Sequence, residues 1–217
     1  MTDHHLPSAV RSAEFAAYLA ARMCHDFISP ASAIVSGLDL LEDPSAQDMR
    51  EEAIGLIGAS ARKLADLLAF SRMAFGASAS AETVDVRELE KLAGGVFRHM
   101  RAELDWAVEA STVNKPAARA LLNLAQMAGQ ALPTGGTARV RAVQEGAAIA
   151  LAVEAKGPRA RLRPEVLQGL QGELMGEGLH GYWVQAYYVQ LFIGDAGGRV
   201  FADVNEERIV FAATIPA

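Results

Sequence analysis

The sequence predicts a multidomain protein in which an N-terminal helical hairpin precedes an α+β domain. Two observations lead to this expectation. Up to Phe75, apolar residues recur at intervals of three and four, which is the spacing of helices that pack side by side. Beyond a short run of small residues, helix-like segments and short strand-like segments follow one another. We place the hairpin at residues 1–76, a linker at 77–83 and the α+β domain at 84–217.

The composition is that of a folded protein that does not bind nucleic acid. Of its 217 residues 51% are apolar, enough for a substantial core, and the formal net charge is −6 at pH 7. Non-specific nucleic-acid binding needs clustered Lys and Arg, so we expect none. Cys24 is the single cysteine, which excludes an intrachain disulfide. No signal peptide or apolar segment of roughly 20 residues is evident, so we expect a cytoplasmic protein without membrane contact.

Two amphipathic patterns predict the hairpin. The first runs from about Ser8 to Leu41, and Pro44 separates it from the second. The first pattern places these apolar residues on one face: Leu19, Met23, Phe27, Ile34, Leu38 and Leu41. The second pattern is a heptad seam: Ile54, Ile57, Ala61, Leu64, Leu68, Ser71 and Phe75. Because two helices alone bury too little surface, we expect a homodimer whose hairpins form a four-helix bundle.

The α+β domain is predicted from alternating patterns and turn residues. Helices are expected near residues 84–100, 116–132, 164–174 and 182–193. Strands are expected near residues 104–110, 138–144, 147–153, 199–204 and 208–215, with a hairpin-like turn at Glu145 and Gly146. This order is typical of helices packed against a mixed or antiparallel sheet.

His25, on the first helix, is the candidate reactive group. At about 100° per residue it lies roughly 200° from Met23, so it faces away from the core. A neutral imidazole is a nucleophile near pH 7 and can take a phosphoryl group from an acyl phosphate. We expect Asp26 to hydrogen-bond the ring and Arg22, one turn earlier, to offset phosphate charge. Most surface histidines on helices have no such role, and periodicity alone favours that plainer interpretation.

The outer face of the helix around His25 is small and polar, with an apolar stripe beside it. The expected neighbours of His25 on this face are Arg22, Ser29, Ser32 and Ser36, and Ser29 is a further candidate site residue. The apolar stripe consists of Cys24, Ile28, Ala31 and Val35, which the core does not need. Exposed apolar positions beside a reactive group indicate a docking surface. The expected partner contacts are Cys24, Ile28, Ser32, Val35 and Ser36.

Residues 25–30, His-Asp-Phe-Ile-Ser-Pro, resemble the H-box of sensor histidine kinases, in which Pro30 would kink the helix. The rest of the chain resembles the Bergerat-like ATP-binding domain of those kinases, with altered motifs. Met127 stands where the N-box has its Mg²⁺-binding asparagine, and a thioether does not bind that ion. Ala155 replaces the adenine-reading aspartate, and Arg159 replaces a glycine. Residues 176–181 resemble the glycine-rich lid, and the dinucleotide motif that they also match lacks its preceding strand.

A kinase-like bundle joined to a degenerate ATP-binding domain resembles the ChpT-type bacterial histidine phosphotransferases over essentially the whole chain. The resemblance implies that His25 accepts a phosphoryl group from the receiver of a hybrid histidine kinase and passes it to response-regulator receivers. It implies no cofactor of the chain's own and no ATP binding, with Mg²⁺ supplied by the receiver. Three alternatives stay open: a sensor kinase with divergent motifs, a non-catalytic dimeric adaptor, and a phosphatase acting on receivers.

Overall fold

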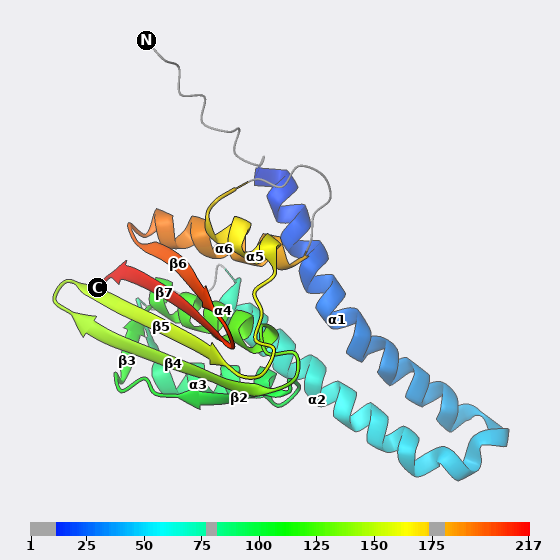
Figure 1. The fold of residues 1–217 in the computed structure, drawn as a ribbon. Coiled ribbons are helices and arrows are strands. Elements are labelled where there is room, and N and C mark those ends of the chain that lie inside the picture. Colours follow the sequence, from blue (N-terminus) through cyan, green and yellow to red (C-terminus); the bar gives the residue numbers. More distant parts are fainter. Residues whose placement is uncertain (1–11, 77–81, 174–180) are drawn as a thin grey trace.

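The hairpin projects from the α+β body (Figure 1). The structure is a computed structural model and describes residues 12–76, 82–173 and 181–217. Helices α1 (Ser12–Glu42) and α2 (Arg50–Ala74) flank the 3₁₀ helix η1 (Pro44–Met49). Asp43 caps η1, because its Oδ1 accepts the backbone N–H of Ser45 at 2.8 Å. The predicted break at Pro44 is confirmed, and residues 8–11 of the predicted first helix lie outside the described residues.

The body contains every helix and strand predicted for it, plus two short strands. Its elements are β1 (Thr83–Asp85), α3 (Val86–Phe97), β2 (Ala102–Trp106), β3 (Thr112–Asn114), α4 (Lys115–Gln130), β4 (Gly136–Glu145), β5 (Ala148–Lys156), α5 (Pro164–Leu170), α6 (Gly181–Asp195), β6 (Arg199–Asn205) and β7 (Arg208–Pro216). The main sheet has the order β2-β4-β5-β7-β6, with β2 and β4 parallel and the other pairs antiparallel. One face of the sheet is covered by helices, since burial alternates along β4, β5 and β7.

Several predicted boundaries need correction. The segment 84–100 is not one helix, because β1 precedes α3 and pairs with β3. The strand expected at 104–110 begins and ends earlier, at Ala102 and Trp106. The helix expected at 164–174 ends at Leu170, and Leu174 lies outside the described residues. The expected linker overlaps β1 at Thr83, and its residues 77–81 are not described.

The hairpin joins the body at both of its ends. Near the end of α2, Phe70 and Ala74 are buried in the same core as α4, whose leucines are fully buried. Near the start of α1, Phe15 packs against Trp183 and Tyr187 of α6. The hairpin therefore contacts the body through its own side chains and not only through the connecting segment.

Part of the predicted bundle core is open in the single chain. Pro30 and Gly37 of α1 are buried in the hairpin, where α1 packs against α2. In contrast, Leu38 is 46% exposed, Ile54 53% and Leu68 49%. We call these three residues the open strip. One hairpin leaves them uncovered, because α1 and α2 cover only one side of each other, and their burial in a four-helix bundle stays a prediction.

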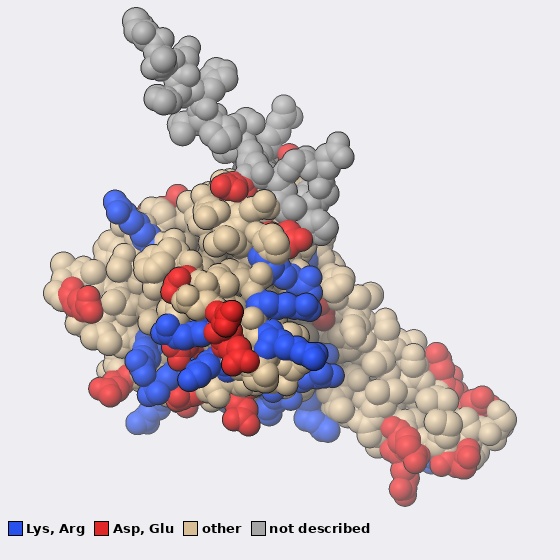
Figure 2. Space-filling model, viewed as in Figure 1, with Lys and Arg blue, Asp and Glu red and all other residues tan. Residues whose placement is uncertain are grey.

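Charges separate along the molecule. Figure 2 shows Asp and Glu side chains gathered at the far end of the hairpin, where α1 passes into η1 and α2. Lys and Arg gather on the body, close to its junction with the hairpin. In the described ranges, no helix is both long and apolar enough to cross a membrane.

Candidate functional site

The His25 side chain projects from α1 into solvent and is 80% exposed. The opposite side of the helix faces α2, and the close approach there depends on Gly37. A Cβ atom at Gly37 would lie 2.6 Å from Cγ1 of Ile57. The prediction that His25 faces away from the hairpin core is confirmed.

Asp26 lies beside the imidazole. Nδ1 of His25 and Oδ1 of Asp26 are 3.4 Å apart, which is long for a hydrogen bond. A proton on Nδ1 points toward the carboxylate, and Nε2 then carries the free lone pair. The expected contact between Asp26 and the ring is therefore present in a weak form.

Arg22 is turned away from solvent. Its Nε lies 3.2 Å from Oδ2 of Asp26, and its side chain is only 9% exposed. Its Cζ lies 5.2 Å from the ring centroid of Tyr182 in α6. The prediction that Arg22 is one of the exposed neighbours of His25 is wrong, because its flank of α1 faces the body. The hairpin pattern alone does not reveal that packing.

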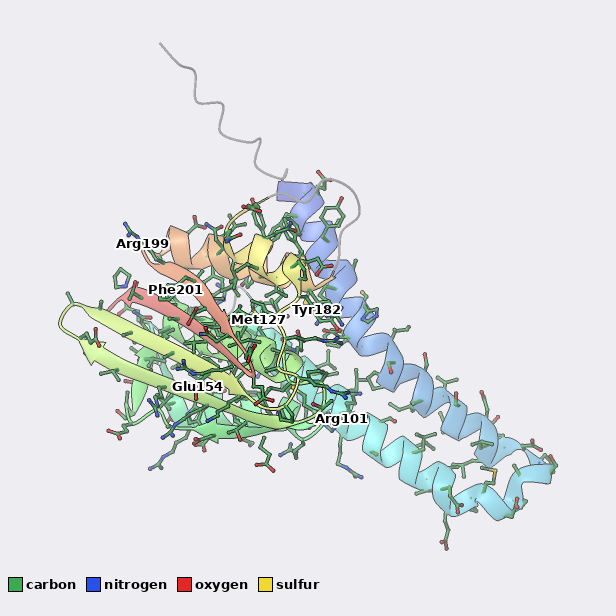
Figure 3. The ribbon with its side chains drawn as sticks, in the orientation of Figure 1. Arg101, Met127, Glu154, Tyr182, Arg199 and Phe201 are labelled. Atoms are coloured by element: carbon green, nitrogen blue, oxygen red, sulfur yellow. The ribbon has the colours of Figure 1, made fainter. Side chains whose placement is uncertain are left out.

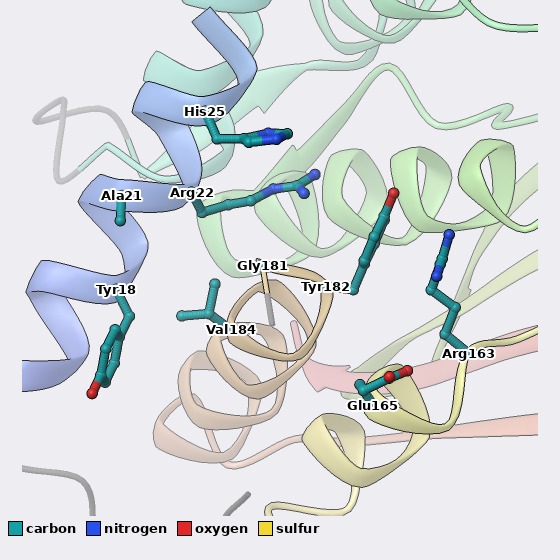
Figure 4. A pocket seen from close by; sticks show the side chains of 9 residues that line it. All are labelled: Tyr18, Ala21, Arg22, His25, Arg163, Glu165, Gly181, Tyr182 and Val184. Carbon is teal, nitrogen blue, oxygen red and sulfur yellow. The ribbon is translucent and has the colours of Figure 1, made fainter. Parts of the chain in front are cut away.

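A cleft of about 360 Å³ lies between α1 and the body (Figure 4). Arg22 and His25 line it from α1, and Arg163, Glu165 and Tyr182 line it from the body. The Cζ of Arg163 lies 4.4 Å from the Tyr182 ring centroid, and Figure 4 shows this ring between the two guanidinium groups. Guanidinium groups are good phosphate partners, so the cleft suits a group that carries negative charge.

Sequence reasoning did not single out Arg163, Glu165 or Tyr182. They follow β5 and begin α5 and α6, and tertiary packing brings them to α1. One oxygen of Glu165, Oε2, is buried and has no hydrogen-bond partner among the described residues. No local pattern around these three residues marks them as neighbours of His25.

The other predicted site residues remain on the outer face of α1. Ile28 is 62% exposed and Val35 57%. These residues are also exposed: Cys24, Ser29, Ser32 and Ser36. The helix thus presents a continuous outer surface on both sides of His25, as the wheel predicts.

The positions that resemble nucleotide motifs are only partly enclosed in the body, because Arg159 is exposed and residues 176–180 of the lid-like segment lie outside the described residues. Met127 and Ala155 are buried. Arg159 has φ 60°, a left-handed conformation that favours glycine, so the turn persists without its glycine. Near the labelled Met127 and Tyr182 of Figure 3, the free space between α4 and the segment before α5 is only about 40 Å³.

A buried polar network occupies the helix that resembles the N-box. Gln185 of α6 donates to Oδ1 of Asn123 at 3.1 Å and to Oε1 of Gln126 at 2.7 Å. Asn123 in turn donates to the backbone carbonyl of Ala74 at 3.1 Å. These polar groups of α4 are satisfied by α2 and α6, so they serve packing of the body against the hairpin.

Residues 86–208 match the family model described as the histidine phosphotransferase C-terminal domain. The chain belongs to this histidine phosphotransferase family. Protein phosphotransferase ChpT of Brucella abortus (strain 2308) is 34% identical to it over 209 residues, covering 96% of this chain and 99% of that one. The phosphotransferase class implied by the sequence is thereby confirmed.

A solved structure agrees with the family. A structure described as a bacterial phosphotransferase aligns with this phosphotransferase at a TM-score of 0.85 and 32% identity, covering 96% of this chain and 99% of that one. The catalytic domain of histidine kinase ThkA aligns at a TM-score of 0.49 and 19% identity, covering 62% and 93%.

The described part of this phosphotransferase shows no group of three or more His, Cys, Asp or Glu side chains that could hold a metal ion.

Proposed function

We propose that His25 is the phosphoacceptor of this histidine phosphotransferase and that it passes phosphoryl groups between receiver domains. The observation that carries the proposal is the exposed imidazole on α1, with Asp26 at the Nδ1 side and Nε2 unobstructed. In the relay, the donor is the receiver of a hybrid histidine kinase, and the acceptors are response-regulator receivers. Family membership and the H-box-like residues 25–30 support the assignment of His25 as the phosphoacceptor.

The transfer step uses Nε2 as the nucleophile. Nε2 attacks the phosphorus of the receiver's aspartyl phosphate, so the N–P bond forms as the P–O bond breaks and the aspartate carboxylate is released. The phosphorylated ring is cationic while Nδ1 keeps its proton, and the Asp26 carboxylate faces that proton. Mg²⁺ comes from the acidic pocket of the receiver, where it neutralises charge on the phosphoryl oxygens. Attack by a second receiver's carboxylate reverses the step.

Receivers dock on the outer face of α1. Ile28 and Val35 lie about 120–140° from Met23 on the helical wheel, between the core and His25 at about 200°. Both are more than half exposed, and a receiver that covers them would bring its aspartate to the imidazole. Small neighbours at Ser29, Ser32 and Ser36 allow close approach.

A second copy of the chain covers the open strip. Leu38 lies nearer the core, at about 60° from Met23, and therefore belongs to a different side of α1 from Ile28. The heptad seam predicts Ile54 and Leu68 inside a four-helix bundle, yet each is about half exposed in the single chain. Two hairpins, each of two antiparallel helices, would bury all three positions in both chains when they face each other.

The α+β body serves binding and architecture in place of ATP hydrolysis. Ligand pockets usually offer about 300–1,000 Å³, and the described space beside Met127 amounts to about 40 Å³. Together with Ala155 and the network around Gln185, this supports a degenerate nucleotide site.

A phosphotransfer assay tests the proposal. Wild type and His25→Gln are given ATP alone, then ATP with a hybrid kinase that carries a phosphorylated receiver. We expect label on wild type only with the donor, none on the variant, and loss of label when a response-regulator receiver is added. Label from ATP alone would identify a kinase. Equal labelling of His25→Gln would overturn the assignment of His25, and no label with any donor would favour the adaptor.

A further inference from the structure

We propose that Tyr182 is a positioning residue for His25, acting through Arg22 and Asp26. The inference rests on the proposed role of His25 and adds that the body sets the orientation and tautomer of the imidazole. Tyr182 itself touches neither His25 nor the transferred group in this scheme.

A chain of contacts joins the aromatic ring to the imidazole. The Cζ of Arg22 lies 5.2 Å from the Tyr182 ring centroid. The Nε of Arg22 lies 3.2 Å from Oδ2 of Asp26, and Oδ1 of Asp26 lies 3.4 Å from Nδ1 of His25. Arg22 therefore contacts both Tyr182 and Asp26, and Asp26 contacts both Arg22 and His25.

Arg22 is held much more firmly than an arginine on a free helix surface. An exposed ion pair one turn apart is weak, because both long side chains move among rotamers and water screens the charges. Here the Arg22 side chain is 9% exposed and lies in the cleft. Gly181 leaves space for it, since a Cβ atom there would lie 3.0 Å from Cδ of Arg22.

The Tyr182 ring is itself fixed on its other side. The Cζ of Arg163 lies 4.4 Å from the ring centroid, and Figure 4 shows the ring between Arg163 and Arg22. Attraction to both guanidinium groups stabilises the position of the ring, so the segment before α5 is connected to the helix that carries His25.

The tautomer of His25 determines which ring nitrogen can attack phosphorus. A carboxylate held beside Nδ1 favours the tautomer that carries its proton on Nδ1, which leaves Nε2 as the nucleophile. If Tyr182 loses its ring, Arg22 is free to leave Asp26, and Asp26 is free to turn from the imidazole. A larger share of His25 then carries its proton on Nε2, which cannot attack phosphorus.

The test measures the tautomer in the free protein and the transfer rate from a phosphorylated receiver. With ¹⁵N-labelled histidine, the His25 ring signals are assigned by comparison with His25→Gln. We expect Tyr182→Leu to shift the ring signals toward the Nε2–H tautomer and to slow transfer about three- to tenfold, the change that corresponds to one net hydrogen bond. Tyr182→Phe keeps the ring and is expected to restore both readouts.

Two further variants separate positioning from packing. Tyr18→Leu alters another aromatic residue of the same cleft, one whose hydroxyl donates to Glu14, and should leave the tautomer unchanged. Arg22→Lys keeps the charge without the planar group, so it should reproduce the tautomer shift of Tyr182→Leu, and the double variant should show no additional shift.

The outcomes are distinguishable. A wild-type tautomer in Tyr182→Leu would overturn the inference, even if transfer slowed, because the residue would then act in docking. Additive shifts in the double variant would also overturn it. Transfer by His25→Gln would instead overturn the proposed function, and it is scored in a separate assay.

Discussion

Phe15 of α1 packs edge-on against Tyr187 of α6, with ring centroids 5.6 Å apart and ring planes at 71°. Tyr187 stacks in turn on Trp183 at 4.7 Å. The aromatic cluster lies at the start of α1, whereas Phe70 and Ala74 join α2 to the main core. The hairpin is thus attached to the body on both helices, which fixes His25 relative to the cleft.

We expect Phe15→Ala to lower the free energy of unfolding by about 1–3 kcal/mol, because a half-buried ring and its aromatic contacts are lost. Urea unfolding at a fixed protein concentration measures the change. Ala16→Ser, an exposed neighbour in the same turn, should change it by less than about 0.5 kcal/mol. Faster amide hydrogen exchange in α6 of Phe15→Ala would locate the loss at this contact, and equal exchange would contradict it.

Gly37 offers a second test, of packing within the hairpin. A Cβ atom there would lie 2.6 Å from Ile57 Cγ1 and 3.2 Å from the Ala53 carbonyl oxygen, so we expect Gly37→Ala to lower the free energy of unfolding by about 1–2 kcal/mol. The matched control is Gly55→Ala, since nothing lies within 4 Å of its Cβ position. There the helix propensity of alanine should raise the free energy of unfolding by up to about 1 kcal/mol. Changes of the same sign at both sites would contradict the close helix approach.

Asp66 of α2 makes stability depend on pH. Its carboxylate lies 3.0 Å from Nε2 of His99 and 3.1 Å from Nη2 of Arg98. Burial raises the pKa of Asp66, but the hydrogen bonds and charges of His99 and Arg98 outweigh burial and hold that pKa below its usual value. Because the folded-state pKa is lowered, the stabilisation is present above the unfolded pKa of about 3.9 and is lost as pH falls through the folded pKa.

Asp66→Asn should therefore lower the free energy of unfolding by about 1 kcal/mol at pH 7, and the difference from wild type should disappear in acid. Thermal unfolding followed from pH 7 to about pH 2 measures both. Asp105→Asn is the control, because the Asp105–Arg139 pair is almost half exposed and should contribute less than about 0.5 kcal/mol. A pH-independent difference for Asp66→Asn would contradict the lowered pKa.

The sequence predicts the fold wherever a periodic pattern is long enough. The hairpin, the break at Pro44 and the hairpin turn at Gly146 all follow from local spacing and turn residues. β1 and β3 escape this reasoning because strands of three residues carry too little pattern, and each forms by pairing with the other.

The candidate site is predictable only in part, for a physical reason. His25 is found because the exposed side of a helix follows from the helix alone. Arg22 and Tyr182 are a different case, since the direction of a long side chain depends on the element packed beside it. That element is α6, whose place against α1 is set by the aromatic cluster around Phe15.

Ile28 and Leu68 separate the two proposed surfaces of the hairpin. We expect Ile28→Asp to slow transfer from a phosphorylated receiver at least about tenfold, because a charge replaces an apolar contact in the docked complex. Its free energy of unfolding and its dimer should be unchanged, since Ile28 is exposed and lies away from the open strip. Leu68→Asp should instead give monomers in sedimentation equilibrium, because a charge buried in the bundle would have no partner.

Sedimentation equilibrium and single-turnover transfer are measured on both variants at the same protein concentrations. If Ile28→Asp becomes monomeric, then Ile28 belongs to the contact between copies, and the docking surface must lie elsewhere on α1. If Leu68→Asp remains dimeric, the open strip is not that contact. Unchanged transfer in Ile28→Asp would remove the docking role of the apolar stripe, because a charge within one turn of His25 cannot be ignored by a partner that covers it.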